Sequence, residues 1–299
     1  MAIEIDHVVD YVDDVNAVWG NKLADGIAMR TPMPFRLTLE SGVPVSVTDQ
    51  TAKTVLRTAW TGLDGNRIHL LDGSTFKPYT IDTLPTASLT ALAPSTIYDV
   101  FGYPLAGVPT LELVAWASTT ARASALTDEQ GYKVKSSDGK RYLGSILSDA
   151  AGGACTQTKY RNGIWNAYNQ VWRPLYTYNS TASWTKATST WEEWNAGTGQ
   201  VRGEFVVGLP GYPLSEPMLG HYVSGTYGID IALEFDSTNA TNRLFAQRIT
   251  SGNLGLLYHS TPTLTAIGYH FITQTASVSI GTATINGGTN WMGKVKILC

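Results

Sequence analysis

Short apolar runs, each bounded by glycine, proline or small polar residues, recur along this chain of 299 residues. They have almost no helical pattern between them, and early examples lie at residues 65–74, 97–101, 111–116 and 140–146. Runs of this length, separated by turn residues, are typical of short antiparallel strands. The chain is therefore expected to be mainly β, in the class of sandwiches, jelly rolls and barrels.

Alternation of apolar and polar residues supports the same class. Phe35, Leu37 and Leu39 alternate with polar residues, and residues 229–235 show the clearest alternation in the chain. Period two is the signature of a strand with one buried face. Asp72-Gly73 and Asp138-Gly139 are dipeptides that favour tight hairpin turns, because glycine readily supplies a positive φ.

The same reasoning predicts further strands at 54–60, 66–71, 75–80, 96–103, 109–117, 131–135, 141–148, 183–187, 189–194, 200–208, 219–226, 242–249, 253–259, 264–273, 276–285 and 293–298. A small-residue stretch at 149–163 is expected to be a loop or a domain junction. Residues 164–175 fit either a short helix or an aromatic strand. We expect two antiparallel β-sandwich or jelly-roll-like domains, at 33–160 and 161–299.

The first 32 residues show a different pattern. Their apolar residues are spaced by three and four positions, as on one face of a helix: Ile5, Val8, Val12, Val15 and Trp19. Asp6 can cap this helix and Gly20 can end it. An isolated helix of about 15 residues is marginal in water, so the stripe must dock on something. We expect a short N-terminal helical segment that anchors or oligomerises the chain, or that packs on its own β domain.

Composition narrows the possible partners. Only 15% of residues are charged, against about 25% in typical soluble domains. The formal net charge of −3 argues against a nucleic-acid partner, since phosphate binding needs a concentrated basic face. The sequence shows no signal-peptide pattern and no apolar run of the roughly 18 residues that a membrane span needs. Cys155 and Cys299 predict no disulfide framework, although Cys299 could cross-link to a neighbour.

Sequence motifs for catalysis or cofactor binding are weak. Glu192 and Glu193 lie between two tryptophans, but adjacent strand residues point to opposite faces and cannot act together on one sugar bond. The five histidines are scattered and match no metal-ligand spacing: His7, His69, His221, His259 and His270. We therefore expect no enzyme activity, no metal site and no cofactor.

Aromatic residues are abundant, with nine tryptophans and fifteen tyrosines. Several lie in polar surroundings, and these could contact a protein or a glycan: Trp184, Trp191, Trp194, Tyr222 and Tyr227. Exposed aromatic rings stack on sugars and anchor protein interfaces. The competing interpretation places most of these rings in the β cores.

Several segments, taken together, resemble a β-rich domain of tailed-bacteriophage structural proteins, described as tail-fibre, head-fibre or minor virion components. In the first half the matching segments are RLTL (36–39), GVPV (42–45), GNRIHLLDG (65–73), YDV (98–100), LELVAW (111–116), KRYLGSI (140–146), WNAYN (165–169) and RPL (173–175). In the second half they are SWT (183–185), FVVG (205–208) and GYHF (268–271). The resemblance implies a virion-associated protein in a homo-oligomeric appendage, and it brings no catalytic residues.

These expectations combine into one functional hypothesis. The chain is expected to be a bacteriophage virion structural protein, a fibre or decoration subunit on the capsid, collar or tail. It would be made in the host bacterial cytoplasm, form a homotrimer and bind other virion proteins through residues 1–32. The alternative is a tail-fibre protein that binds a host-receptor glycan.

Overall fold

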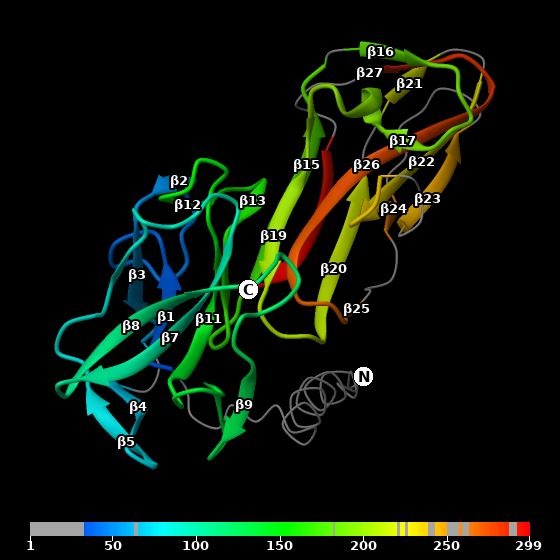
Figure 1. The fold of residues 1–299 in the computed structure, drawn as a ribbon. Helices are drawn as coiled ribbons and strands as arrows, with labels where there is room; N and C mark the ends of the chain where they lie inside the picture. The colour runs from blue at the N-terminus through cyan, green and yellow to red at the C-terminus, as the bar shows by residue number, and fades with distance from the viewer. Residues whose placement is uncertain are drawn as a thin grey trace, which may run out of the picture.

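The computed structural model describes residues 33–62, 65–181, 183–219, 222–224, 227–238, 243–249, 257–258, 263–286 and 292–299. Within these ranges the chain is mainly antiparallel β structure (Figure 1). The expected N-terminal helix, with Ile5, Val8, Val12, Val15 and Trp19, lies outside the described residues.

Three sheets surround the first hydrophobic core. A three-stranded sheet has the order β1 (Phe35–Thr38), β3 (Val55–Trp60), β6 (Ala87–Ser88). A second sheet has the order β8 (Val108–Ala115), β7 (Ile97–Leu105), β11 (Arg141–Leu147), β10 (Tyr132–Lys135), β9 (Leu126–Glu129), and β14 (Ile164–Asn166) also pairs with β11. The third is the hairpin of β4 (Arg67–Asp72) and β5 (Thr75–Thr80), closed by Gly73 at a φ of 68° as the Asp72-Gly73 signal predicts.

An eight-stranded sheet runs from the first half of the chain into the second. Its order is β2 (Gln50–Lys53), β12 (Cys155–Gln157), β13 (Arg161–Asn162), β19 (Gly203–Val207), β26 (Gly268–Gly281), β22 (Tyr227–Phe235), β23 (Arg243–Ile249), and β17 (Glu192–Glu193) also pairs with β26. Among the pairings of the described strands, only β13 with β19 is parallel.

Two further sheets and a short helical turn complete the second half. One sheet has the order β18 (Gln200–Val201), β15 (Trp172–Asn179), β28 (Met292–Leu298), β20 (Tyr212–Leu219), β24 (Leu257–Tyr258), and β25 (Thr263–Leu264) also pairs with β20. The other has the order β16 (Ser183–Lys186), β27 (Ala283–Asn286), β21 (Tyr222–Ser224). The 3-10 turn η1 (Trp194–Gly197) is the only helical element in the part of the chain that the structure describes.

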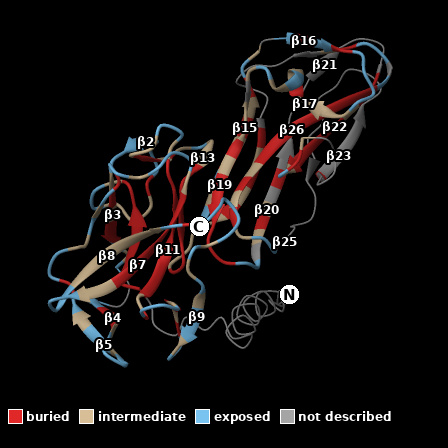
Figure 2. Cartoon of the chain, viewed as in Figure 1, coloured by how far each residue is buried: buried red, intermediate tan, exposed pale blue. Residues whose placement is uncertain are grey.

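Strand β19 lies between two hydrophobic cores (Figure 2). Its side chains alternate between the two faces of the sheet, so Val206 packs into the first core while Phe205 and Val207 pack into the second. The first core also holds Trp165 from β14 and Cys299 from the end of the described chain. The two cores therefore share a strand and are in contact along it.

The division at residue 160 into two domains stays a prediction. The packing does not follow that division, because Ile164, Trp165 and Tyr168 belong to the first core although they follow residue 160. The aromatic run 164–175, which fitted either a helix or a strand, forms two strands, β14 and the start of β15.

Strand β1 differs from its predicted half-buried pattern. Arg36 and Thr38 are 4% and 2% exposed, so both faces of this strand are covered. The expected exposed face is wrong because Asn169 and Cys299 pack against Arg36 and accept its hydrogen bonds. Alternation of apolar and polar residues predicts one apolar face of a strand. It does not predict whether a distant segment will cover the other face.

Candidate functional site

The aromatic residues expected at a contact surface are largely buried. Trp184 is 9% exposed and Trp194 is 1% exposed, and their ring centroids lie 5.4 Å apart in the second core. The indole Nε1 of Trp194 donates to the carbonyl oxygen of Thr275 at 3.2 Å. The expected exposure of Trp184 is therefore wrong, because its polar neighbours in sequence lie on the opposite side of β16. Neither ring is accessible to a glycan or a protein partner.

The other three aromatic candidates have separate positions. Trp191 is half-buried just before β17. Tyr222 lies in β21 and Tyr227 begins β22, where they pair with Asn286 and Gly281. The side chains of these two tyrosines are outside the described part of the structure.

The two adjacent glutamates are held by different partners. Glu192 pairs with Lys186, while the Oε1 atom of Glu193 lies 2.7 Å from Arg202 Nε and accepts a 2.8 Å bond from the Thr273 hydroxyl. Burial would raise the pKa of Glu193, but these bonds and the charge of Arg202 together lower it. Each carboxylate is held in a structural ion pair.

An exposed apolar turn lies at the tip of the β7–β8 hairpin. Leu105 and Val108 pair across the turn, and they are 57% and 61% exposed. Between them, Ala106 and Gly107 have φ values of 49° and 83°, so both central residues are left-handed, as in the tight turns that suit hairpins. Pro104 and Pro109 flank the turn. We call residues 105–108 the hairpin tip. No charged residue lies between positions 104 and 111.

A cluster of four charges holds this hairpin in place. Glu112 on β8 accepts from Lys135 Nζ at 2.9 Å and from Lys140 Nζ at 2.8 Å. Asp138, in the turn between β10 and β11, lies 2.9 Å and 3.3 Å from the same two ammonium groups. Lys140 also lies 4.5 Å from the ring centroid of Tyr103 on β7. The cluster links β8, β10 and the turn before β11, and the contact of Lys140 with Tyr103 extends it to β7.

The protonation behaviour of this cluster follows from its contacts. Burial would raise the pKa of Glu112, but hydrogen bonds from Lys140 and Lys135 outweigh burial and lower it. The pKa of Asp138 is lowered in the same way, and the pKa values of both lysines are raised. All four groups are therefore charged at neutral pH.

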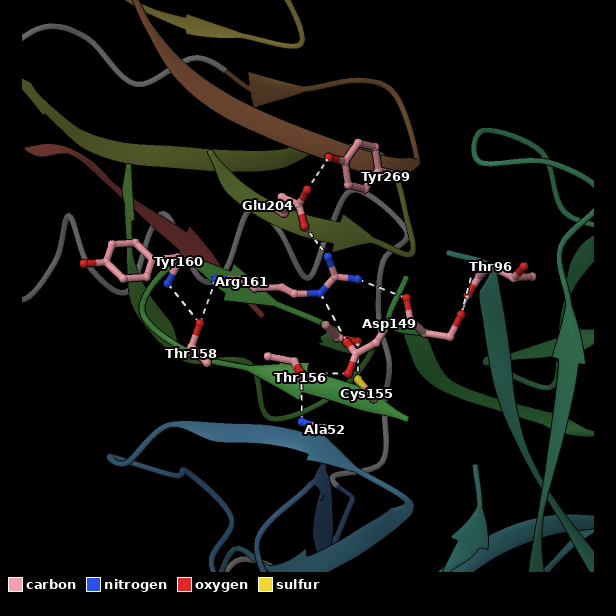
Figure 3. A network of polar contacts seen from close by, with 12 residues as sticks. Ala52, Thr96, Asp149, Cys155, Thr156, Thr158, Tyr160, Arg161, Glu204 and Tyr269 are labelled. Atoms are coloured by element: carbon pink, nitrogen blue, oxygen red, sulfur yellow. Dashed lines mark hydrogen bonds and ion pairs between the residues drawn. The ribbon is translucent and has the colours of Figure 1, made fainter. Parts of the chain in front are cut away.

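A second polar network joins the two cores around Arg161 of β13 (Figure 3). Its guanidinium pairs with Glu204 of the shared strand β19, donates to the Ser148 carbonyl at 3.0 Å, and lies 3.5 Å from Asp149 Oδ1. Glu204 Oε1 accepts a 2.9 Å bond from the hydroxyl of Tyr269 on β26. Burial and the charge of Glu204 raise the pKa of Tyr269. The tyrosine therefore stays a donor at neutral pH.

The network continues to the edge of the eight-stranded sheet. The Thr156 hydroxyl donates to Asp149 Oδ2 at 2.8 Å and accepts a 2.9 Å bond from the backbone N–H of Ala52. Ala52 has a φ of 49°, and the Thr156 bond satisfies its amide there. One chain of polar contacts thus runs from β2 through β12 and β13 to β19 and β26.

A buried ion pair holds the loop after β19 against the first core. Arg122 Nε lies 2.7 Å from Asp99 Oδ2, and the guanidinium also donates to the Gly208 carbonyl and, at 3.1 Å, to the Tyr142 hydroxyl. Burial raises the pKa of Asp99, while the charge of Arg122 opposes this rise. The guanidinium also lies 4.5 Å from the ring centroid of Trp116.

No sequence motif marks the hairpin tip as a candidate. The predicted strands 96–103 and 109–117 flank it, and the residues between them carry no turn signal of the Asn-Gly or Asp-Gly type. The useful signal is the apolar run Leu105 to Val108 between two prolines, because a turn at that position leaves aliphatic side chains without a core to enter.

Both cysteines are free and buried. Neither lies at the surface where a cross-link to a neighbouring chain could form. Across the described ranges, no group of three or more histidine, cysteine, aspartate or glutamate side chains is arranged to hold a metal ion. In the same part of the chain, no helix has the length and apolar character needed to span a bilayer.

The chain matches no protein family model, and no curated protein matches it. Three insecticidal toxins of Bacillus thuringiensis are distantly similar in structure. The δ-endotoxin Cry8Ea1 is 8% identical with a TM-score of 0.23, over 89% of this chain and 52% of the toxin. A Cry1Da tryptic core variant is 11% identical with a TM-score of 0.19, over 81% and 47%. Cry7Ca1 is 10% identical with a TM-score of 0.18, over 88% and 50%. The chain spans about half the length of these toxins, and similarity at this level supports neither a shared fold nor a shared function.

Proposed function

We propose that this chain is a structural subunit of a bacteriophage virion, an appendage on the capsid, collar or tail that acts by assembly and multivalent binding. The observation that carries the proposal is the hairpin tip. It presents Leu105 and Val108 to solvent on a hairpin whose second strand is tied to its neighbours by the ion pairs of Glu112. Exposed aliphatic side chains on a rigid support gain free energy when a partner covers them, about 1 kcal/mol each at this exposure.

The finer architecture belongs to the same proposal. Residues 1–32 act as the anchor to the particle, and the two cores form two sandwich-like bodies that share β19. The chain assembles as a homotrimer, in which neighbouring copies cover exposed apolar groups and strand edges. Other virion proteins bind the N-terminal segment. Many weak contacts then act together through avidity. The low charged fraction of 15% suits a protein whose surface is partly covered by copies of itself.

The competing role is recognition of a host-receptor glycan. It requires an exposed aromatic surface that includes Trp184, Trp191 and Trp194. Because Trp184 and Trp194 belong to the second core, only Trp191 keeps partial exposure among these three. The assembly role therefore has the better support.

The solution mass of the full chain tests the assembly role. We expect a trimer by light scattering, and the double variant Leu105→Ser/Val108→Ser should shift it towards the monomer. Val47→Ser is the matched control, since Val47 is 94% exposed but lies outside the hairpin. A wild-type monomer at micromolar concentration would contradict the proposed homotrimer. A trimer that survives the double variant would place the subunit contact elsewhere.

The virion location needs a separate test. An antibody raised against the purified chain, labelled with gold, should decorate intact particles purified from a lysate of the producing culture. Preimmune serum is the control. Label that remains in the particle-free fraction would reject the virion assignment, whatever the oligomeric state of the purified chain.

A further inference from the structure

A hollow of about 390 Å³ lies between the end of β1 and the corner where β2 meets β3. Its lining includes two cations, a carboxylate and two aliphatic side chains, besides neutral polar groups: Lys53, Arg57, Glu40, Leu39 and Val55. The volume falls in the range of sites that bind small molecules.

The two cations have no partner within the described part of the chain. Lys53 is exposed and Arg57 is half-buried, and neither forms an ion pair or a hydrogen bond there. By contrast, the lysines of the hairpin cluster and Arg161 of β13 are paired with carboxylates. Two unpaired positive charges on one hollow provide an attractive field for an anion.

The rest of the lining is suited to a hydroxylated molecule. The Oε2 atom of Glu40 accepts from the Ser46 hydroxyl and, at 3.4 Å, from Gln50 Nε2. These bonds fix the carboxylate and leave its Oε1 atom as an acceptor for a ligand hydroxyl. Val55 and the buried Leu39 supply an apolar wall against which a ring face can pack.

We propose that this hollow binds a small polyhydroxylated molecule that carries one carboxylate or one phosphate, such as a uronic acid or a sugar phosphate. Lys53 and Arg57 bind the anionic group, and Glu40 accepts from a hydroxyl. A planar guanidinium beside an ammonium matches either anion. The proposal does not depend on the virion role or on the oligomeric state.

Isothermal titration of the full chain at low salt tests this site with four probes: glucuronate, glucose 6-phosphate, glucose and inorganic phosphate. We expect at least one of the two anionic sugars to bind about tenfold more tightly than glucose, because glucose lacks the charge that the two cations attract. The sugar that binds more tightly identifies the preferred anionic group.

Two variants and a matched control locate the binding. Lys53→Gln and Arg57→Gln should each weaken binding of the anionic sugar about fivefold, the effect of losing one exposed charge contact. Arg67→Gln removes the same charge from an exposed position on β4, outside the hollow, and should leave affinity unchanged. Since neither lining cation has a partner to lose, all three variants should keep the wild-type Tm.

Three results would overturn the inference. One is the absence of heat with both anionic sugars. Another is a loss of affinity in Arg67→Gln as large as in the two lining variants. The third is inorganic phosphate binding as tightly as glucose 6-phosphate, which would reduce the hollow to an adventitious ion site.

Discussion

The guanidinium of Arg36 on β1 donates a 2.9 Å hydrogen bond to the carbonyl oxygen of Cys299, the residue after the final strand. The same side chain donates to the Pro44 carbonyl at 3.2 Å and to the Asn169 carbonyl. Arg36 is only 4% exposed. One buried side chain thus connects the first described strand, the segment before β15 and the end of β28.

Replacing this arginine should destabilise the protein strongly. Arg36→Met keeps an apolar stem of similar length but leaves the Pro44 and Asn169 carbonyls without this donor, while the Cys299 carbonyl keeps only its bond from the Val171 N–H. Each buried acceptor that loses its partner costs about 1 kcal/mol or more, so we expect the free energy of unfolding to fall by roughly 2 kcal/mol. Urea denaturation followed by tryptophan fluorescence measures this change.

The matched control is Arg67→Met on β4, where the arginine is exposed. Its effect should stay within about 0.5 kcal/mol. Equal losses in the two variants would show that Arg36 does not connect the segments energetically.

The polar network around Arg161 should show energetic coupling between Arg161 and Glu204. Arg161→Met and Glu204→Gln remove the two ends of the ion pair between β13 and β19. Residues in direct contact within one network typically couple by 0.5–3 kcal/mol, and we expect a coupling energy of about 1 kcal/mol here. A double-mutant cycle of urea denaturation curves measures it.

The control cycle pairs Arg161→Met with Lys77→Met on β5, which lies outside this network and pairs with Asp72 instead. That pair should be additive within about 0.5 kcal/mol. If the unfolding free energies of Arg161→Met and Glu204→Gln are also additive, the ion pair between them contributes no coupling energy.

The local fold was largely readable from the sequence, because strands and hairpin turns are encoded by neighbouring residues. The predicted strand 75–80 coincides with β5, and the alternation at 229–235 lies within β22. Predicted strands at 264–273 and 276–285 instead belong largely to one long strand, β26, followed by β27.

Long-range packing was not readable in the same way. The burial of Arg36 depends on segments more than 130 positions away, and the burial of Trp184 depends on contact with Trp194 and the sheets around it. A polar local context predicts exposure only where no distant segment covers the residue. The hollow beside Lys53 needs a shorter-range arrangement, since residues 39–41 and 50–57 must come together to line it.

Acid should weaken the ion pairs that Glu112 forms from the β7–β8 hairpin with Lys135 and Lys140. The pKa of Glu112 is lowered from 4.5 in the folded state, so its ion pairs contribute stability above pH 4.5. That contribution is lost as the pH falls below 4.5 through the folded-state pKa. Between pH 7 and pH 3, the wild type should therefore lose roughly 1 kcal/mol more unfolding free energy than Glu112→Gln.

Asp128→Asn serves as the control for the acid effect, because the Asp128 side chain is 66% exposed and pairs with a single lysine. Its pH dependence should follow that of the wild type. If the pH dependence of Glu112→Gln also follows that of the wild type, the ion pairs of Glu112 do not stabilise the protein.

The thiols should be protected in the folded protein. Burial, with a further contribution from the charge of Asp149, raises the pKa of Cys155 to about 12, and burial also raises the pKa of Cys299. Thiolate is the reactive form, so at pH 8 both groups should react with a disulfide reagent only after unfolding. Two equivalents should then appear in denaturant, and Cys155→Ala should release one. Rapid labelling of the native wild type would contradict this packing.

The approach of Gly208 to the first core leaves no room for a side chain. A Cβ atom there would lie 2.1 Å from the Tyr142 hydroxyl oxygen and 2.3 Å from Trp165 Cε3. Both rings are fully buried, and the Tyr142 hydroxyl is bonded to Ser145 at 2.7 Å, so neither ring can move aside cheaply. Backbone movement would also disturb the bond from Arg122 to the Gly208 carbonyl.

Gly208→Ala should therefore lower the free energy of unfolding by about 3 kcal/mol, the upper part of the range for overpacking a core. Gly211→Ala, in the same loop, meets open space and carries only the strain of its positive φ of 87°. That strain amounts to about 1–2 kcal/mol. Thermal and urea unfolding of the two variants should place Gly208→Ala clearly below Gly211→Ala. The reverse order would mean that the loop after β19 does not pack against Tyr142 and Trp165, and that the two cores are joined by β19 and Arg161 without it.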